Sequence, residues 1–439
     1  MTVKKNDKVH SLRKSGRDSD TNLLGNAYIR AVNRARIIDL FRSGQLMSRA
    51  DLARHCDLSK PTVSAIVDDL INEGVLQEAG KRSSEGGRRA RLLELNPGSS
   101  TFAGIHFGES VTQVAVTDAF GRILAKRFAE TVTGRPEQSM VLARELVVEA
   151  LAAIHAEPER VNAVGVSVPG LVSRQGGTCK IAPNLGWHNY PVAKELARLL
   201  GVEVYVANTT QTAALAEYQM GVARDVQDFV WLYVGNGVGS CAVQGGRIQF
   251  GSRGFAGEIG HVHVDSSDIL CGCGKRGCLE TTCSNLAIVR AFKQAMEAGG
   301  QPTSLSGKEK ITAQDVSQAA SNGDALAEKV MKDAGRALGV GAAMAINMYD
   351  PQMVVIGGPV AGADEIFLSG VRERVGELAL ESAGTDIVFS HLGRDIYLQG
   401  AVSMAMEQSN AAYRIVKSAR SMDIDDSDDA DSATHSASL

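Results

Sequence analysis

Three cysteines and one histidine form the densest group of potential metal ligands in the chain. Cys271, Cys273 and Cys278 lie within eight residues, separated by glycines that permit sharp turns, and His261 precedes Cys271 by ten residues. Three thiolates and one imidazole complete the tetrahedral set that zinc prefers, and they leave no position for a reactive water. The pattern therefore predicts a structural zinc site; reduced thiols without a metal are the alternative.

A second group of polar side chains lies on predicted helices near the N-terminus. Apolar residues repeat at helical spacing over Tyr28–Arg42. A short helix then runs from the N-cap Ser48 to His55, and a third helix, Thr62–Asn72, follows the N-cap Ser59 and Pro61, whose missing N–H costs little in a first turn. This layout predicts a helix-turn-helix.

The start of the third helix and a basic loop are the candidate DNA-contacting parts. In this motif the N-terminal residues of the last helix meet base edges in the major groove. Val75–Glu78 and Arg91–Leu95 are predicted to pair as a hairpin whose basic, Gly-rich loop suits the minor groove or the backbone. Asp68 and Asp69, further along the helix, would repel phosphate if they faced it. The candidate DNA contacts are Ser59, Lys60, Thr62, Ser64, Ala65, Arg88 and Arg89; a helix bundle without a DNA role is the alternative.

Charge is divided unevenly between this head and the remainder of the chain. Residues 1–92 hold 18 Lys and Arg against 11 Asp and Glu, whereas the rest holds 28 against 39. A basic head on an acidic body indicates that the head meets a polyanion such as double-stranded DNA, with chance surface variation as the alternative.

Length and composition favour a multidomain α/β protein. A chain of 439 residues is too long for one ordinary domain, and its 44% hydrophobic residues and 46 glycines suit buried strands and helices joined by tight turns. Seven cysteines, three of them clustered, favour a metal site in a reducing compartment over a disulfide framework. With no signal-peptide-like segment and no apolar run long enough to span a membrane, we expect a cytoplasmic protein with no membrane partner.

The body from Thr101 onward alternates strands and helices in two similar halves. In the first half the predicted elements are strands Phe102–Phe107, Val111–Asp118 and Ile123–Glu130, helix Glu137–Ala156 and strand Ala163–Val168. In the second half they are strands Phe229–Val234 and Ser240–Gln244, helix Ala325–Met348 and strand Met353–Ile356. The repetition predicts two α/β lobes.

Head, wing and cysteine cluster together resemble the ROK family (repressors, open reading frames and sugar kinases), specifically its repressor branch. The resemblance covers about Tyr28 to Val416 and is strongest in Ala256-Gly-Glu-Ile-Gly-His261 and in Cys271 through Glu280. Other matching stretches are Gly87-Arg88, Val164–Gly170, Asn184–Trp187, Ala213–Glu217 and Gly357–Pro359.

The resemblance implies a winged helix-turn-helix followed by a two-lobed, actin-like sugar-kinase fold. It also implies self-association as a homodimer or homotetramer. The expected parts are a disordered arm (1–26), the DNA-binding head (27–96), lobe one (97–212, completed by a C-terminal helix over 398–418), lobe two with the zinc site (213–397) and an acidic disordered tail (419–439).

The resemblance further implies a sugar site between the lobes. In the family's kinases sugar hydroxyls are held by residues that correspond to Asn208, Glu258, His261 and Glu280 in this sequence. Carboxylates and amides suit vicinal hydroxyls, and a zinc ion would fix the ring orientation of His261. Taken singly, each of these residues also fits an ordinary polar loop.

Three departures from the kinases argue against phosphoryl transfer. The position of the general base holds Thr209, and loss of such a base costs about 10²–10⁴-fold in rate. The first phosphate loop, usually Asp-x-Gly-Gly-Thr, reads His106-Phe-Gly-Glu-Ser110, and Glu109 would repel phosphate. The second phosphate loop, usually Gly-Thr-Gly, reads Gly235-Asn-Gly-Val-Gly239; its glycines persist, but alone they are a weak signal.

The sequence therefore predicts a regulator with no catalytic residue. We expect a DNA-binding repressor of carbohydrate uptake or metabolism genes that senses a sugar or sugar derivative through an inactive kinase-like body. The alternatives are an ATP-dependent sugar kinase with an appended head, and a regulator whose body serves only oligomerisation.

Overall fold

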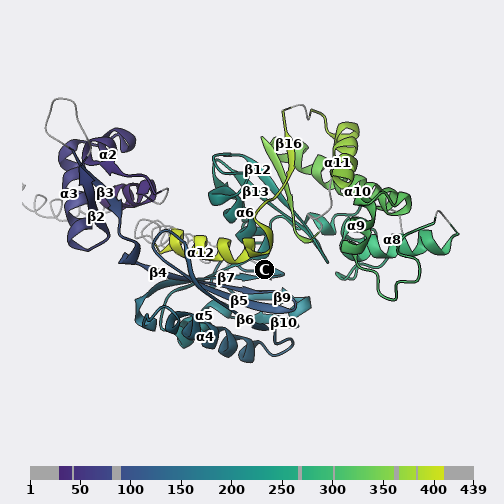
Figure 1. Cartoon of the computed structure of the whole chain (residues 1–439), viewed down its shortest axis with the longest axis horizontal. Helices are drawn as coiled ribbons and strands as arrows, with labels where there is room; N and C mark the ends of the chain where they lie inside the picture. The colour runs from purple at the N-terminus through teal and green to yellow at the C-terminus, as the bar shows by residue number, and fades with distance from the viewer. Residues whose placement is uncertain are drawn as a thin grey trace, which may run out of the picture.

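A computed structural model describes residues 29–41, 44–81, 90–264, 269–299, 302–359, 365–381 and 384–409. The predicted arm and tail, the wing residues Arg88 and Arg89, and the last predicted helix beyond residue 409 lie outside these ranges. The chain forms a head and two sheet-based lobes (Figure 1). In this part of the chain no helix is long and apolar enough to cross a membrane.

The head combines three helices with a small antiparallel sheet. Its elements are a helix over residues 29–41, β1 (Met47–Ser48), α2 (Arg49–Cys56), α3 (Lys60–Asn72), β2 (Leu76–Lys81) and β3 (Arg91–Leu95), with sheet order β1-β3-β2. Ser48 and Asp51 form a capping box at the start of α2. Asp57, with a φ of 53°, turns the chain sharply into α3. The apolar faces of the helices bury one core, which includes Ile37, Phe41, Leu52, Val63, Val67 and Leu70.

Lobe one is a five-stranded mixed sheet in the order β11-β7-β4-β5-β6. The strands are β4 (Thr101–Phe107), β5 (Val111–Thr117), β6 (Ile123–Glu130), β7 (Val161–Val168) and β11 (Val204–Asn208). Helices α4 (Pro136–Ala152) and α5 (Val192–Leu200) cover one face and α12 (Ile396–Gln408) covers the other (Figure 1). A second sheet joins β8 (Leu171–Val172), β9 (Cys179–Ala182) and β10 (Trp187–Tyr190).

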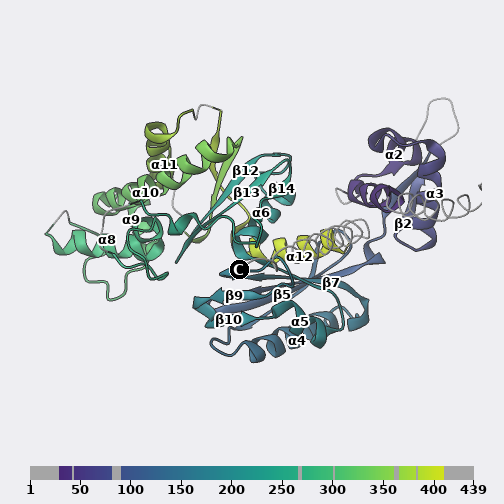
Figure 2. The same ribbon diagram turned by 180° about the vertical axis from the view of Figure 1, so that it is seen from behind.

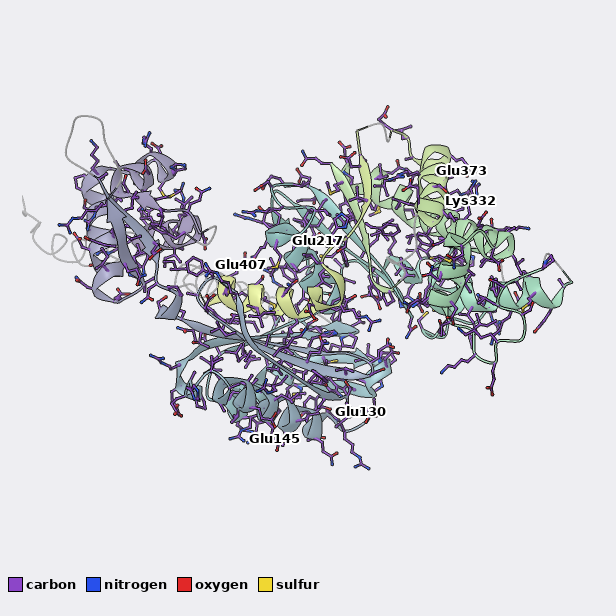
Figure 3. All side chains as sticks on the ribbon, viewed as in Figure 1. Glu130, Glu145, Glu217, Lys332, Glu373 and Glu407 are labelled. Carbon is purple, nitrogen blue, oxygen red and sulfur yellow. The ribbon has the colours of Figure 1, made fainter. Side chains whose placement is uncertain are left out.

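Lobe two is also a five-stranded sheet, in the order β14-β13-β12-β15-β16. Read from the opposite edge, the sheet of lobe one has its strands in the same order along the chain. Its strands are β12 (Phe229–Val234), β13 (Val238–Gln244), β14 (Arg247–Ile248), β15 (Met353–Gly357) and β16 (Asp386–Phe389). Its helices are α6 (Thr209–Met220), α7 (Glu280–Cys283), α8 (Asn285–Glu297), α9 (Ala313–Ser321), α10 (Ala325–Tyr349) and α11 (Glu365–Leu378). Helices α8 to α11 lie together on the side of the sheet away from α6 (Figure 2). On their surface Lys332 of α10 pairs with Glu373 of α11 at 3.0 Å (Figure 3).

Helices α6 and α12 form the packed centre between the lobes. A Cβ on Gly400 of α12 would lie 1.8 Å from the Thr212 carbonyl oxygen of α6, and one on Gly165 of β7 would lie 1.7 Å from the Ala401 carbonyl oxygen. Only glycine permits such close approach of helix and backbone. The buried hydroxyls of Ser167 and Thr212 are 2.9 Å apart, so lobe one, α6 and α12 are held tightly together.

The head packs directly on lobe one through the turn between β5 and β6. Ala119 is buried in the apolar core of the head, and Phe120 packs against it. The Asp118 carboxylate accepts the backbone N–H groups of Phe120 and Arg122, which fixes the turn. Ala119 also donates its N–H to the Pro97 carbonyl in the connection between head and body. The head therefore contacts lobe one through the turn between β5 and β6.

Candidate functional site

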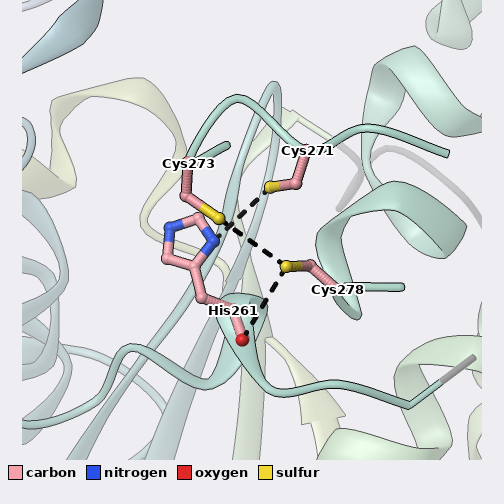
Figure 4. Close-up of side chains that lie close together, drawn as sticks. All are labelled: His261, Cys271, Cys273 and Cys278. Atoms are coloured by element: carbon pink, nitrogen blue, oxygen red, sulfur yellow. Dashed lines mark hydrogen bonds between the residues drawn. The ribbon is translucent and has the colours of Figure 1, made fainter. Parts of the chain in front are cut away.

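The four predicted metal ligands converge in lobe two. His261 ends a short 3-10 turn (Ile259–His261), and the loop that carries the cysteines is closed by isolated bridges, His263 with Cys278 and Leu270 with Arg276. The four ligand atoms all lie within 4.8 Å of one another (Figure 4). The sequence-predicted set is thus brought together as one cluster that could hold a metal ion.

The spacing within the cluster fits a tetrahedral ion with zinc's bond lengths. Zn–S bonds of about 2.3 Å and a Zn–N bond of about 2.0–2.1 Å place two sulfurs about 3.8 Å apart and a sulfur and a nitrogen about 3.5 Å apart. The Cys273 and Cys278 Sγ atoms are 3.7 Å apart, and Cys271 Sγ lies 3.6 Å from His261 Nδ1. The donor set and these two separations therefore suit a tetrahedrally bound metal ion.

His261 divides its two ring nitrogens between the cluster and a carboxylate. Nδ1 faces Cys271, while Nε2 lies 4.0 Å from Glu258 Oε2. A ligand role for Nδ1 would leave Nε2 to face Glu258, so His261 can serve both of its predicted roles. Burial raises the pKa of Glu258; His261 opposes this rise and Glu280 adds to it.

Glu280 begins α7 directly after the cysteine loop and connects it to the second phosphate loop. One carboxylate oxygen lies 3.4 Å from Cys271 Sγ, and the other accepts the Val238 N–H at 3.1 Å. The structure thus places Glu258, His261 and Glu280 in one connected group around the cysteine cluster.

Asn208 is the last residue of β11 and the N-cap of α6. Its Oδ1 caps α6 by accepting the Gln211 N–H and the Thr210 hydroxyl, both at 2.9 Å, while no described residue bonds its Nδ2. Gln211 donates to the Gly254 carbonyl at 3.1 Å, in the loop that leads to Glu258. Asn208 is thus connected, through Gln211 and the Gly254 carbonyl, to the loop that leads to Glu258.

The first residue of the altered phosphate loop, His106, packs against an aromatic side chain. The buried His106 ring stacks on Tyr397 with centroids 4.8 Å apart, and Tyr397 meets Tyr233 edge-on at 6.3 Å. Burial lowers the pKa of His106 from 6.5 to about 4, although a contact with the Ser167 backbone opposes the shift. A neutral imidazole thus stands where the family's kinases carry an acidic residue.

Glu109 makes a contact that the sequence analysis did not find. Its carboxylate accepts from Asn184 Nδ2 at 2.6 Å and from Asn236 Nδ2 at 2.7 Å. These partners are 75 and 127 residues away, so only the folded chain brings them together. Thr209, at the position of the kinases' base, is the first residue of α6.

The predicted DNA contacts at the start of α3 are accessible. The Ser59 hydroxyl caps α3 through the Thr62 N–H and lies 2.8 Å from the Thr62 hydroxyl. Lys60, Thr62 and Ala65 are exposed, whereas Ser64 is half-buried. The wing candidates Arg88 and Arg89 lie outside the described residues.

The acidic residues at the other end of α3 are paired with arginines. Arg49 bonds Asp68 at 2.7 Å, and from the first helix Arg30 pairs with Asp69 and Arg34 with Glu73. The arginine partners of Asp68 and Asp69 were not predicted from the sequence. Arg30 and Arg34 are four residues apart, as are Asp69 and Glu73, so each pair lies on one face of its helix. This matched spacing could have predicted the two ion pairs.

Comparison with known proteins assigns both parts of the chain. The model of the ROK family matches residues 102–408, and that of the IclR helix-turn-helix domain matches residues 31–80. The chain is 29% identical to the xylose repressor of Caldicellulosiruptor bescii, over 80% of this chain and 88% of the relative. It is 28% identical to the DNA-binding transcriptional dual regulator NagC of Escherichia coli, over 82% and 88% of the two chains.

Solved structures of a regulator and of a kinase also match the chain. A ROK family transcriptional regulator, a homologue of the E. coli MLC protein, has a TM-score of 0.78 at 26% identity and covers 89% of this chain and 98% of its own. A ROK family glucokinase from Streptomyces griseus, in complex with glucose and AMPPNP, has a TM-score of 0.60 at 27% identity and covers 70% and 99%. The kinase match covers less of this chain than the regulator match does.

Proposed function

Because the chain belongs to the ROK family, we propose that it is a sequence-specific DNA-binding transcription regulator. In this proposal it represses genes of carbohydrate uptake or metabolism, and its kinase-like body senses a sugar or sugar derivative. The observation that carries the proposal is an exposed, correctly capped α3 on a head that packs directly against the sugar-kinase-like body. Relatives of similar length that are named as a repressor or as a DNA-binding transcriptional regulator support it.

The proposed division of labour assigns each group of residues one task. The head would read DNA, and two heads on a homodimer or homotetramer would read an inverted repeat. Zinc would hold the loop that carries the sugar ligands, and we expect no kinase activity. The proposed DNA contacts are Ser59, Lys60, Thr62, Ser64, Ala65, Arg88 and Arg89; the sugar ligands are Asn208, Glu258, His261 and Glu280; and the zinc ligands are His261, Cys271, Cys273 and Cys278.

DNA recognition is tested by mapping the binding sites of the full-length protein across its genome and then measuring affinity for the strongest site. Lys60→Ala should weaken binding about tenfold, since a base or phosphate contact of this kind contributes about 1–3 kcal/mol. Lys194→Ala, which removes an exposed charge from α5, is the matched control and should leave affinity unchanged. Equal affinity of both variants would contradict the assigned role of α3.

Sugar sensing is tested by measuring operator affinity and thermal stability with a panel of pentoses, hexoses and amino sugars. Xylose and N-acetylglucosamine come first because relatives are named for them. A sugar that raises the melting temperature and changes operator affinity supports the proposal. Intact DNA binding with no response to any sugar would favour a body that serves only oligomerisation.

A further inference from the structure

The carboxylate of Glu109 joins the two lobes. Glu109 follows β4 of lobe one, and its oxygens accept hydrogen bonds from Asn184, also in lobe one, and from Asn236, in the loop after β12 of lobe two. The two bonds, 2.6 and 2.7 Å long, use both carboxylate oxygens. Glu109 is therefore a bridging acceptor between parts of the chain that belong to different sheets.

The partner in lobe two lies in the middle of the second phosphate loop. A tight turn, closed by a 2.9 Å bond from the Gly235 N–H to the Gly237 carbonyl, carries Asn236 at its tip. On the other side of this loop the Val238 N–H donates to Glu280 at 3.1 Å. The glycines of this loop suit phosphate binding. Two of its donors, Asn236 Nδ2 and the Val238 N–H, instead bond the carboxylates of Glu109 and Glu280.

The half-buried Tyr233, near the end of β12, lies near this loop and both carboxylates. Its ring is close enough to the loop that a Cβ on Gly235 would lie 2.1 Å from the Tyr233 hydroxyl. Burial raises the pKa of Tyr233 above its usual range, and the negative charges of Glu109 and Glu280 raise it further. Negative charge from the chain is therefore concentrated at the loop, where it disfavours a bound phosphate.

We propose that the carboxylate of Glu109 takes the place of a nucleotide phosphate that a kinase would bind. It bridges Asn184 and Asn236 and so connects the two lobes without a nucleotide. Glu109 acts as a positioning residue that sets the spacing of the lobes. The bridge is exposed to solvent, so each bond contributes little, and the lobes can still be moved by a ligand bound elsewhere between them.

The test uses full-length protein and hydrogen exchange of the backbone amides of residues 235–239. Glu109→Ala removes both acceptors from lobe one, and we expect amide exchange in this lobe-two loop to become about three- to tenfold faster. Glu159→Ala, which removes an exposed carboxylate elsewhere in lobe one, is the matched control and should leave the loop unchanged. Asn236→Asp, which opposes two carboxylates, should accelerate exchange at least as much as Glu109→Ala.

Chemical rescue separates a bridging anion from a general loss of packing. Acetate or inorganic phosphate added to Glu109→Ala should slow exchange at residues 235–239 back toward the wild-type rate, because either anion can accept from the two asparagines. Neither anion should alter the wild type or Asn236→Asp. Unchanged exchange in Glu109→Ala, or faster exchange that neither anion reverses, would overturn the proposal. The readout involves no DNA or sugar, so its failure is distinct from failure of the proposed regulatory function.

Discussion

The resemblance to the family's kinases implies unchanged residue types at the sugar positions Asn208, Glu258 and Glu280, and changed ones at His106 and Glu109 of the first phosphate loop. The retained residues also support the fold. Asn208 caps α6, and Glu280 bonds the second phosphate loop and approaches Cys271. The kinases' base, by contrast, is replaced by a threonine at the first position of α6. The predicted sugar ligands Asn208 and Glu280 thus also make bonds within the fold, whereas the residue at the position of the kinases' base differs from theirs.

Two residues of the first phosphate loop make contacts within the protein. His106 is buried against Tyr397, and Glu109 bonds two asparagines. A buried neutral imidazole and a bonded carboxylate are both poor neighbours for a magnesium–nucleotide complex, which needs carboxylate ligands for the metal and positive charge or N–H donors for the phosphates. Substitutions at the predicted metal and sugar ligands and at the first phosphate loop can therefore test this difference.

Loss of the metal cluster should have the largest effect. Cys278→Ser removes one buried ligand, and we expect zinc content to fall from about one per chain to near zero, with the free energy of unfolding lowered by several kcal/mol. Metal analysis by mass spectrometry and chemical denaturation measure the two effects. Cys241→Ala, at a buried cysteine outside the cluster, should keep its zinc. An unchanged metal content in Cys278→Ser would show that the four residues are not the ligands.

The buried His106 should make stability depend on pH. Its pKa falls from 6.5 to about 4 on folding, so the unfolded chain binds more protons between these values and stability decreases as pH falls through this window. The loss amounts to up to about 3 kcal/mol between pH 7 and pH 4. His106→Phe keeps an aromatic ring beside Tyr397 and should flatten this part of the unfolding profile, whereas His155→Asn, at an exposed turn, should not. If the free energy of unfolding depends on pH equally in both variants, folding does not lower the pKa of His106.

A smaller effect is expected at Asn208, where the ligand role can be separated from the cap. Asn208→Asp keeps an oxygen that caps α6 but removes the Nδ2 donor. We expect about tenfold weaker binding of the sugar identified in the panel, by calorimetry, since a lost hydrogen bond to a buried ligand costs about 1–1.5 kcal/mol. The melting temperature without sugar should stay close to that of the wild type. A fall in melting temperature with unchanged affinity would assign Asn208 to the fold alone.

Local patterns in the sequence predicted most of the head and the principal elements of both sheets. Helix α3 starts two residues before the predicted Thr62 and ends at the predicted Asn72, because apolar spacing and an N-cap are local signals. The predicted helix from Glu137 ran four residues too far, since α4 ends at Ala152 before a turn in which His155 has a φ of 54°. The β8–β10 sheet was not predicted because its strands have only two to four residues.

Site residues were predictable where family motifs are continuous and not where the fold joins distant segments. The cysteines lie in one short stretch, and the structure brings them together with His261. The bond between Glu109 and Asn236 joins positions 127 residues apart, and nothing in either local sequence indicates the pairing. The same is true of the stack between His106 and Tyr397, which depends on α12 returning to lobe one.

Restoring the kinases' base alone should have no measurable effect on catalysis. Thr209→Asp places a carboxylate at the start of α6, where an acidic side chain suits the helix dipole, so the variant should fold. With His106 and Glu109 unchanged, the metal and the phosphates of ATP still lack partners, and we expect sugar-dependent ATP turnover below about 0.01 s⁻¹, against roughly 1–100 s⁻¹ for kinases. Turnover in the kinase range would show that the missing base was the only obstacle. Adding His106→Asp and Glu109→Gly to Thr209→Asp tests the converse, because activity that appears only in the triple variant would place the barrier at the first phosphate loop.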